Sequence, residues 1–314
     1  MAQTRKEPFA GEIQTSPEGG SDGSAAGVPS RGERDRLGGS GAPVSGFKLR
    51  KLEEEAQKNW DLFYKRNTTN FFKDRHWTTR EFQELEACRE FEAQRLVLLE
   101  AGCGVGNCLF PLLEDDLNVF VYACDFSPRA VDFVKRNPLY GPERCCAFQC
   151  DLTKDDLRAQ VPEGGVDVVT LIFVLSAVHP DKMHLTLQNI SRVLKPGGFV
   201  LFRDYGLNDH AMLRFKAGSK LGENFYVRQD GTRTYFFSKE RLAELFADAG
   251  LQALSNEYVL RETVNKKEGL RVPRVFLQSK FTKPVCGLIS KAAAHTTTYS
   301  PTSPAPSPAE EGGA

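Results

Sequence analysis

The chain is organised around residues 96–107, whose sequence is LVLLEAGCGVGN. The apolar residues at 96–99 predict a buried strand, and residues 107–113 show helical spacing. A strand that enters a helix through a glycine-rich loop offers backbone N–H groups and a positive helix end to a ligand. The glycines also let a ligand approach the main chain closely. This segment therefore predicts a ligand-binding loop, with a purely structural turn as the alternative.

The spacing of the glycines differs from the dinucleotide pattern G-x-G-x-x-G, because no glycine falls three positions after Gly104. Glu100 precedes the first glycine, and a carboxylate there suits a ligand that carries an amine better than one that carries a pyrophosphate. The string E-A-G-C-G-V-G resembles motif I of the S-adenosylmethionine-dependent methyltransferases. That resemblance implies that Glu100, Gly102 and Gly104 bind this cofactor.

Strand-like and helical segments alternate after the glycine loop. Continuous apolar strands in such an alternation predict a parallel sheet covered on both faces. Two later strands are expected to pair as an antiparallel hairpin, so the expected fold is α/β, a seven-stranded Rossmann-like sheet that is mostly parallel. The strands are expected at 96–100, 119–125, 145–151, 166–174, 199–204, 257–262 and 274–281, and the helices near 107–113, 128–136, 181–194 and 238–249.

The flanks differ in composition from this alternating region. Residues 1–45 and 285–314 are rich in Gly, Ser, Pro and Ala, so we expect a disordered arm and tail around a domain at 46–284. Within the domain, the aromatic and helical segment 46–94 predicts an N-terminal cap. Residues 205–237 form an insertion after the fifth strand, where open α/β sheets carry ligand sites.

The composition excludes several classes of protein. The 41 basic and 41 acidic residues balance, and the eight cysteines show neither a zinc spacing nor a disulfide pattern. We therefore expect no metal, a reducing compartment (the cytoplasm and also the nucleus) and no membrane span.

Two acids follow neighbouring strands. Asp125 comes some twenty residues after the glycines, where a carboxylate can bind a ribose diol, and Asp151 follows the third strand, near the expected adenine. Both are also explained as helix caps, and Ser127-Pro128 is a typical helix start. The fourth strand is expected to line the cofactor with its last residues.

The segments after the fourth and fifth strands bear on which atom accepts the methyl group. The Asn/Asp-Pro-Pro-aromatic tetrad of enzymes that methylate exocyclic amines of bases is absent, because residues 173–176 are Phe-Val-Leu-Ser. Asp204 ends the fifth strand and is expected to face the transfer site, with a surface ion pair between Arg203 and Asp204 as the alternative. His179 is expected to be structural.

Residues 47–283 resemble the tRNA N3-methylcytidine methyltransferases, and within them the serine-tRNA branch. The resemblance is carried by W-D-x-F-Y, F-K-D-R-H-W, L-S-A-V-H-P and R-D-Y-G together with the glycine loop. It implies serine tRNA as substrate, seryl-tRNA synthetase as partner, and a monomer. It also implies that Arg75 and Asp204 face the target cytidine, and that the cofactor contacts include Trp60, Tyr64, His76, Gly102, Asp125, Asp151, the adjacent Leu152, and Ile172.

The chemistry of cytosine N3 agrees with this set. N3 has a free lone pair and needs no general base, so catalysis consists of alignment and stabilisation of a developing cation, for which Asp204 is the candidate. The base must be unpaired or flipped, as in an anticodon loop, and Phe71 or Phe72 could stack on it.

Two segments have an excess of positive charge. Residues 48–80 contain nine Lys/Arg against five Asp/Glu, and residues 261–283 contain seven against two. If both border one end of the sheet, they predict a groove for tRNA. Two other functions remain as alternatives, a protein methyltransferase and a non-catalytic binding subunit.

Overall fold

The computed structural model describes residues 44–86, 95–115, 118–265 and 270–285. The expected disordered arm and tail therefore lie almost wholly outside the described residues, as does the end of the expected cap at 87–94. The described part of the cap is helical, as predicted. Its helices are α2 (Gly46–Glu54), α3 (Ala56–Asn67), α4 (Trp77–Glu81) and α5 (Gln83–Glu86).

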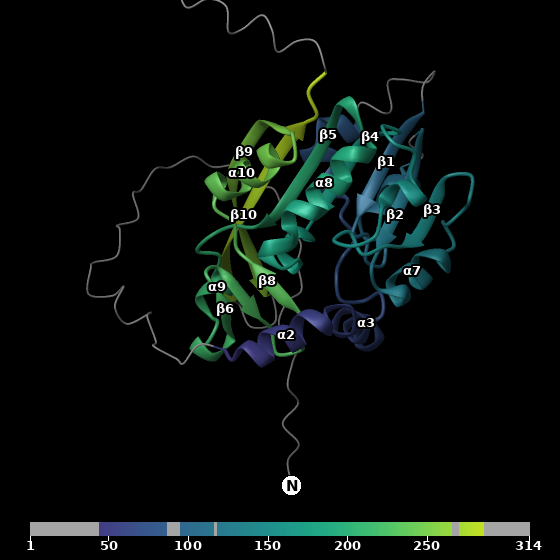
Figure 1. Ribbon diagram of the computed structural model, residues 1–314. Coiled ribbons are helices and arrows are strands. Elements are labelled where there is room, and N and C mark those ends of the chain that lie inside the picture. Colours follow the sequence, from purple (N-terminus) through teal and green to yellow (C-terminus); the bar gives the residue numbers. More distant parts are fainter. Residues whose placement is uncertain (1–43, 87–94, 116–117, 266–269, 286–314) are drawn as a thin grey trace, which may run out of the picture. The chain divides into compact units, whose positions relative to one another are not determined.

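The main sheet has seven strands in the order β3-β2-β1-β4-β5-β10-β9 (Figure 1). The first five strands run parallel, and β10 pairs antiparallel with both β5 and β9. The predicted seven-stranded, mostly parallel α/β fold with a C-terminal hairpin is confirmed. The strands are β1 (Leu96–Ala101), β2 (Val119–Asp125), β3 (Cys145–Gln149), β4 (Val166–Ile172), β5 (Leu194–Tyr205), β9 (Gln252–Asn265) and β10 (Leu270–Thr282).

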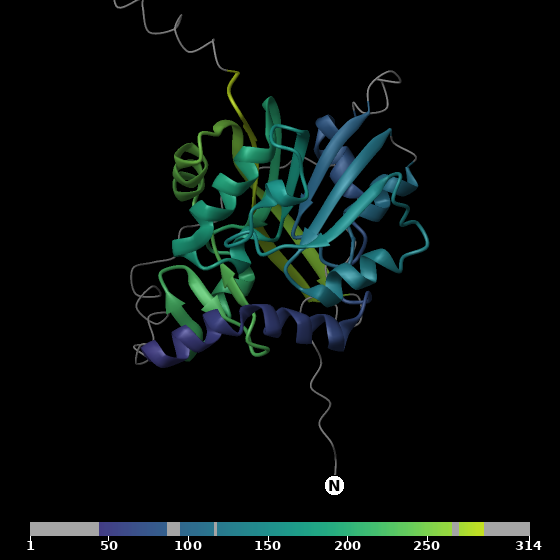
Figure 2. The ribbon, with the colours of Figure 1, turned by 45° about the vertical axis from the view of Figure 1, so that its right-hand side comes forward.

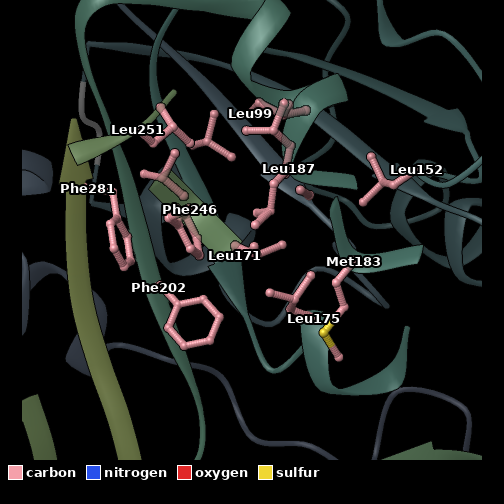
Figure 3. Close-up of a cluster of buried hydrophobic side chains, with 14 of the residues drawn as sticks. Leu99, Leu152, Leu171, Leu175, Met183, Leu187, Phe202, Phe246, Leu251 and Phe281 are labelled. Carbon is pink, nitrogen blue, oxygen red and sulfur yellow. The ribbon is translucent and has the colours of Figure 1, made fainter. Parts of the chain in front are cut away.

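Helices cover both faces of this sheet because successive strand residues point to opposite sides. Leu98 packs with α6 and α7 on one face, whereas Leu99 packs with α8 and α10 on the other. The hydrophobic cluster that contains Leu99 includes large side chains such as Phe202 and Phe246 (Figure 3). The helices are α6 (Leu109–Glu114), α7 (Pro128–Lys135), α8 (Met183–Val193) and α10 (Lys239–Asp248).

β5 begins five residues earlier than the strand expected at 199–204. The strand begins at Leu194, directly after α8, and its residues 195–198 form an irregularity in the pairing with β4. Gly197 has φ 81°, and its N–H donates to the carbonyl of Lys283. The Lys-Pro-Gly-Gly segment therefore bends the strand without ending it.

The insertion contains an unpredicted three-stranded antiparallel sheet. Strands of three residues are too short for a periodic pattern to reveal them. They are β6 (Lys220–Gly222), β7 (Phe225–Val227) and β8 (Arg233–Tyr235), and a short helix α9 (His210–Leu213) precedes them.

Helices α2 and α3 lie across the carboxyl ends of the parallel strands, beside α7 and the small sheet (Figures 1 and 2). Asp61 of α3 accepts hydrogen bonds from the Ser127 hydroxyl and the Arg129 backbone at the start of α7. Asn59 donates to the carbonyl of Gly231, and Glu53 of α2 forms ion pairs with Lys182 and Arg233. The two helices thus join the glycine-loop half of the sheet to the insertion. No helix among the described residues is long and apolar enough to cross a membrane.

Candidate active site

The glycine loop between β1 and α6 has backbone conformations that residues with a Cβ rarely adopt. Gly102, Gly104 and Gly106 have φ angles of 71°, 54° and 91°. A Cβ on Gly102 would lie 2.5 Å from Val174 Cγ2, and one on Gly104 would lie 3.0 Å from the Tyr64 hydroxyl. The glycines therefore allow the segment after β4 and helix α3 to pack closely against the loop.

Asp125 at the end of β2 fastens this loop. Its carboxylate accepts the backbone N–H of Gly104 at 3.0 Å and that of Ser127 at 2.9 Å. Burial raises the pKa of Asp125 to about 6, although these two hydrogen bonds act in the opposite direction. The predicted contact with a ribose stays a prediction. Ser127 caps α7 by accepting the N–H of Ala130, so the predicted helix start is confirmed.

Glu100 lies near the end of β1, just before the glycine loop, and its side chain is buried. Burial raises the pKa of its carboxyl group to about 8, whereas the positive charge of Arg75 and a hydrogen bond from the Leu109 backbone act to lower it. No described residue donates a hydrogen bond to its buried Oε2. A buried acceptor without a donor is costly in a folded protein, so this atom suits a positively charged ligand group.

Trp60, Tyr64 and His76 reach different surroundings. Tyr64 is buried beside the glycine loop, and the ring of Trp60 lies 6.0 Å from it. His76 is exposed at the start of α4, where its backbone carbonyl accepts the Thr79 hydroxyl. The structure thus brings the two aromatic residues to the loop and leaves the His76 side chain in solvent.

Asp151 and Leu152 follow β3, next to Asp125. The N–H of Cys150 donates to the carbonyl of Asp125, which joins the two turns. Burial acts to raise the pKa of Asp151, but hydrogen bonds from Lys154 and Thr153 outweigh it and lower the pKa. Leu152 is a buried core residue. Both positions are compatible with the predicted contacts, which stay predictions.

The end of β4 meets Arg75. Ile172 is buried, and its carbonyl accepts a hydrogen bond from Arg75 Nη1 at 3.0 Å. The backbone N–H of Arg75 donates to the carbonyl of Asn107, and the side-chain amide of Asn107 donates to Asp74. The segment before α4 is therefore laid directly over the glycine loop.

Asp204 near the end of β5 is fully buried. Its carboxylate accepts the backbone N–H groups of Ser176 and Tyr205, each at 2.9 Å. Burial raises its pKa to about 6, with these hydrogen bonds opposing the shift. The alternative of a surface pair with Arg203 is wrong, because Arg203 is buried and pairs with Glu81 at 2.8 Å.

Two further predictions concern aromatic and histidine side chains. Phe71 and Phe72 pack edge to face on each other, and both rings contact Phe63. They therefore contribute to packing, and the predicted stacking on a base stays a prediction. His179 caps the 3-10 helix Pro180–Lys182 by accepting the N–H of Asp181, in agreement with its predicted structural role. No group of potential metal ligands occurs in the described part of the chain.

Comparisons with known proteins agree with this geometry. A family model described as a methyltransferase domain matches residues 99–200. The rat protein named tRNA N(3)-cytidine methyltransferase METTL6 is 75% identical over 257 residues, which cover 82% of this chain and 90% of that protein. The human protein of that name is 75% identical over 80% of this chain. The zebrafish protein named tRNA N(3)-cytidine methyltransferase METTL2 is 42% identical over 77% of this chain.

The chain belongs to the tRNA N(3)-cytidine methyltransferase family. The family expected from the residues is therefore confirmed. Among solved structures, a methyltransferase from Anabaena variabilis described as SAM-dependent covers 72% of this chain with a TM-score of 0.52 at 14% identity, a likeness that shows the fold.

The sequence did not reveal two features of the site of this tRNA N(3)-cytidine methyltransferase family member, the role of Asp61 and the backbone conformation of Phe173. Asp61 holds α3 on α7, and only its place in the W-D-x-F-Y string marked it. Phe173 is among the last residues of the strand expected at 166–174 to line the cofactor, but β4 ends at Ile172 and Phe173 has a φ of 58°, a conformation that no local pattern signals.

Proposed function

We propose that this chain transfers the methyl group of S-adenosylmethionine to N3 of cytidine in tRNA. The observation that carries the proposal is the 75% identity, over 82% of the chain, to a rat protein whose name states this reaction. The geometry of the glycine loop supports a methyl donor of this kind, and the properties of the buried carboxylates support an acceptor that becomes positively charged.

The donor fits the residues present. The glycines let Val174 and Tyr64 pack directly against the loop backbone, so these side chains enclose the loop. S-adenosylmethionine would supply a methyl group activated by a sulfonium, and it also carries an ammonium group. Glu100, Gly102, Gly104, Asp125, Asp151 and Ile172 would hold it, and Oε2 of Glu100 is the acceptor that still lacks a donor among the described residues.

The chain's own groups perform three tasks in the transfer. Tyr64 and Trp60 cover the glycine loop and exclude water from it. Asp204, whose pKa near 6 leaves it mostly ionised at neutral pH, supplies negative charge near the end of β5. Its carboxylate is buried, so it acts on the developing cation through space in a medium of low dielectric constant.

The first basic segment presents exposed positive charge at the carboxyl ends of the parallel strands. Exposed basic side chains of the first segment line α2, α3 and the turn after them, at Lys48, Arg50, Lys51, Lys65 and Lys73. These helices lie at the carboxyl ends of the strands, where transfer would occur (Figure 2).

The second basic segment is divided between the two ends of the sheet. Arg274 pairs with Asp209 near the carboxyl end of β5, whereas Lys283 donates to the carbonyls of Ser191 and Leu194 near its amino end. Residues 266–269 lie outside the described residues. We therefore assign the phosphate contacts chiefly to the N-terminal helices, with support from exposed residues of the insertion such as Lys216 and Lys220.

The finer features of the proposal rest on the resemblance of the quoted motifs. They are an anticodon-loop target in serine tRNA, action with seryl-tRNA synthetase, a monomeric enzyme, and a place in the cytoplasm and nucleus. A monomer has a limited surface for recognising a whole tRNA, and a synthetase that binds the same tRNA would supply the missing identity contacts.

The test is incubation of the full chain with labelled S-adenosylmethionine and total tRNA, followed by nucleoside mass spectrometry. We expect label in N3-methylcytidine, with an increase when seryl-tRNA synthetase is added. A Gly102→Val variant, whose side chain would collide with Val174, is the matched inactive control. Label in protein, or donor binding without transfer to any RNA, would favour one of the two alternative functions and overturn the proposal.

A further inference from the structure

Phe173 has a backbone conformation that bulky residues rarely adopt. Its φ of 58° places it in the left-handed region, directly after the last residue of β4. Four non-glycine residues of the described chain have a positive φ, and two of them are asparagines, which tolerate it. Strain of this kind persists where the surroundings enforce it, and it is frequent at functional sites.

The surroundings of Phe173 hold the strained turn from both sides. Its N–H donates to the carbonyl of Arg203 at 2.7 Å. Arg203 is itself fixed, because its guanidinium lies 4.2 Å from the Trp77 ring centre and pairs with Glu81. The preceding carbonyl, of Ile172, accepts the hydrogen bond from Arg75.

The strained turn changes the face of the sheet to which the ring points. Consecutive residues of an extended strand point to opposite faces. Ile172 and Phe173 nevertheless pack against the same hydrophobic cluster, the one on the side of α4. The turn therefore moves the Phe173 ring to the side from which Arg75 approaches.

The ring then contacts the guanidinium group. Cζ of Arg75 lies 5.2 Å from the centre of the Phe173 ring, within the range of a cation–π interaction. The centres of the Tyr205 and Phe276 rings lie 5.1 and 5.4 Å from that of Phe173. The ring is half-buried, so these neighbours support it while part of it remains accessible.

Arg75 retains hydrogen-bonding capacity in this position. The Ile172 carbonyl holds Nη1, whereas the buried Nε has no partner among the described residues. Its positive charge also reaches Glu100, behind the glycine loop. The guanidinium therefore lies between the end of β4 and the donor loop with an N–H group still to be satisfied.

We propose that Phe173 is a positioning residue that orients the Arg75 guanidinium toward the pyrimidine acceptor. The inference rests on the proposed function and deepens it. A guanidinium N–H can donate to the O2 carbonyl of cytosine, which adjoins N3, and so fix the direction of the N3 lone pair. N3 then donates this pair to the methyl carbon while the pair of the broken carbon–sulfur bond stays on sulfur, and no proton has to leave the base.

The test compares Phe173→Leu, which keeps an apolar side chain without a π face, with Phe173→Tyr, which keeps the ring. We expect Phe173→Leu to lower kcat about tenfold or more at saturating donor, with donor affinity within about twofold of the parent. Phe173→Tyr is expected to retain most of the parent kcat. Phe120→Leu is the matched control, because it removes a similar contact, 5.1 Å from Arg95, at the opposite end of the sheet.

A double-mutant cycle separates positioning from an independent role. If Phe173 acts through Arg75, then Arg75→Ala and Arg75→Ala/Phe173→Leu have equal rates. An undiminished effect of Phe173→Leu in the Arg75→Ala background, or unchanged kcat in the single variant, overturns the inference while leaving the proposed function intact. A parent protein that forms no N3-methylcytidine removes both.

Discussion

The Asp125 carboxylate accepts the backbone N–H of Gly104 at 3.0 Å, so the end of β2 holds the loop that follows β1. Its other oxygen accepts the N–H of Ser127, which begins the turn into α7. One side chain thus connects the glycine loop to the next crossover. Asp125, which the sequence predicts to bind the ligand, therefore also holds the glycine loop in place.

Asp125→Ala is expected to weaken binding of S-adenosylmethionine at least about tenfold and to lower the free energy of unfolding by about 1–3 kcal/mol, because two backbone donors lose their acceptor. Calorimetry measures the affinity, and chemical denaturation measures the stability. Asp132→Ala, at an exposed position on α7, is the matched control. An unchanged affinity in Asp125→Ala would contradict the placement.

Gly102→Ala is expected to destabilise the protein more than Gly250→Ala. Both glycines have positive φ, 71° and 76°, but a Cβ on Gly102 would lie 2.5 Å from Val174, whereas Gly250 has open space. The backbone alone costs about 1–2 kcal/mol, and the collision adds about 1–3 kcal/mol. Thermal melting of the two variants, with Gly102→Ala/Val174→Ala as a partial rescue, measures the difference. Equal losses would show that Val174 yields without cost.

The raised pKa of Glu100 predicts that the free energy of unfolding falls as the pH rises. Burial lifts its pKa from an ordinary 4.5 to about 8, so the folded protein keeps a proton that the unfolded chain loses. The stabilisation is complete below about pH 4.5 and disappears as the pH passes about 8. Melting temperatures measured without donor should therefore fall between pH 5.5 and 8.5, and Glu100→Gln should flatten this decline. A parallel slope in the variant would assign the decline to other groups.

Asp204→Ala is expected to keep donor affinity and to lose transfer by about a hundredfold, in line with the removal of one electrostatic stabiliser. In the parent protein, kcat should rise through about pH 6, where burial places the pKa of this carboxyl. Single-turnover rates at saturating donor between pH 5 and 8 measure both effects. A loss of donor binding in Asp204→Ala would mean that the residue supports the donor loop instead.

The layout of the sheet was predictable because its signals are local. A buried strand appears as a continuous apolar run, as at 166–172, and a helix start appears as Ser127-Pro128. The ends were less accurate: β9 begins five residues earlier than the expected 257–262, at Gln252. The pairing of residues 252–256 with β10 is a backbone property that their largely exposed side chains do not reveal.

The sequence by itself determined the succession of strands and helices, the glycine loop and the identity of the acids around it, because these depend on neighbouring residues. Only the tertiary structure decided what those groups contact: Asp204 with the backbone of Ser176, 28 residues away, and Arg75 with Ile172, 97 residues away. It also placed Phe173 in a left-handed turn and sent Lys280 to Glu84, away from the expected groove. Such contacts join distant parts of the chain, and no local spacing records which of them the packed core brings together.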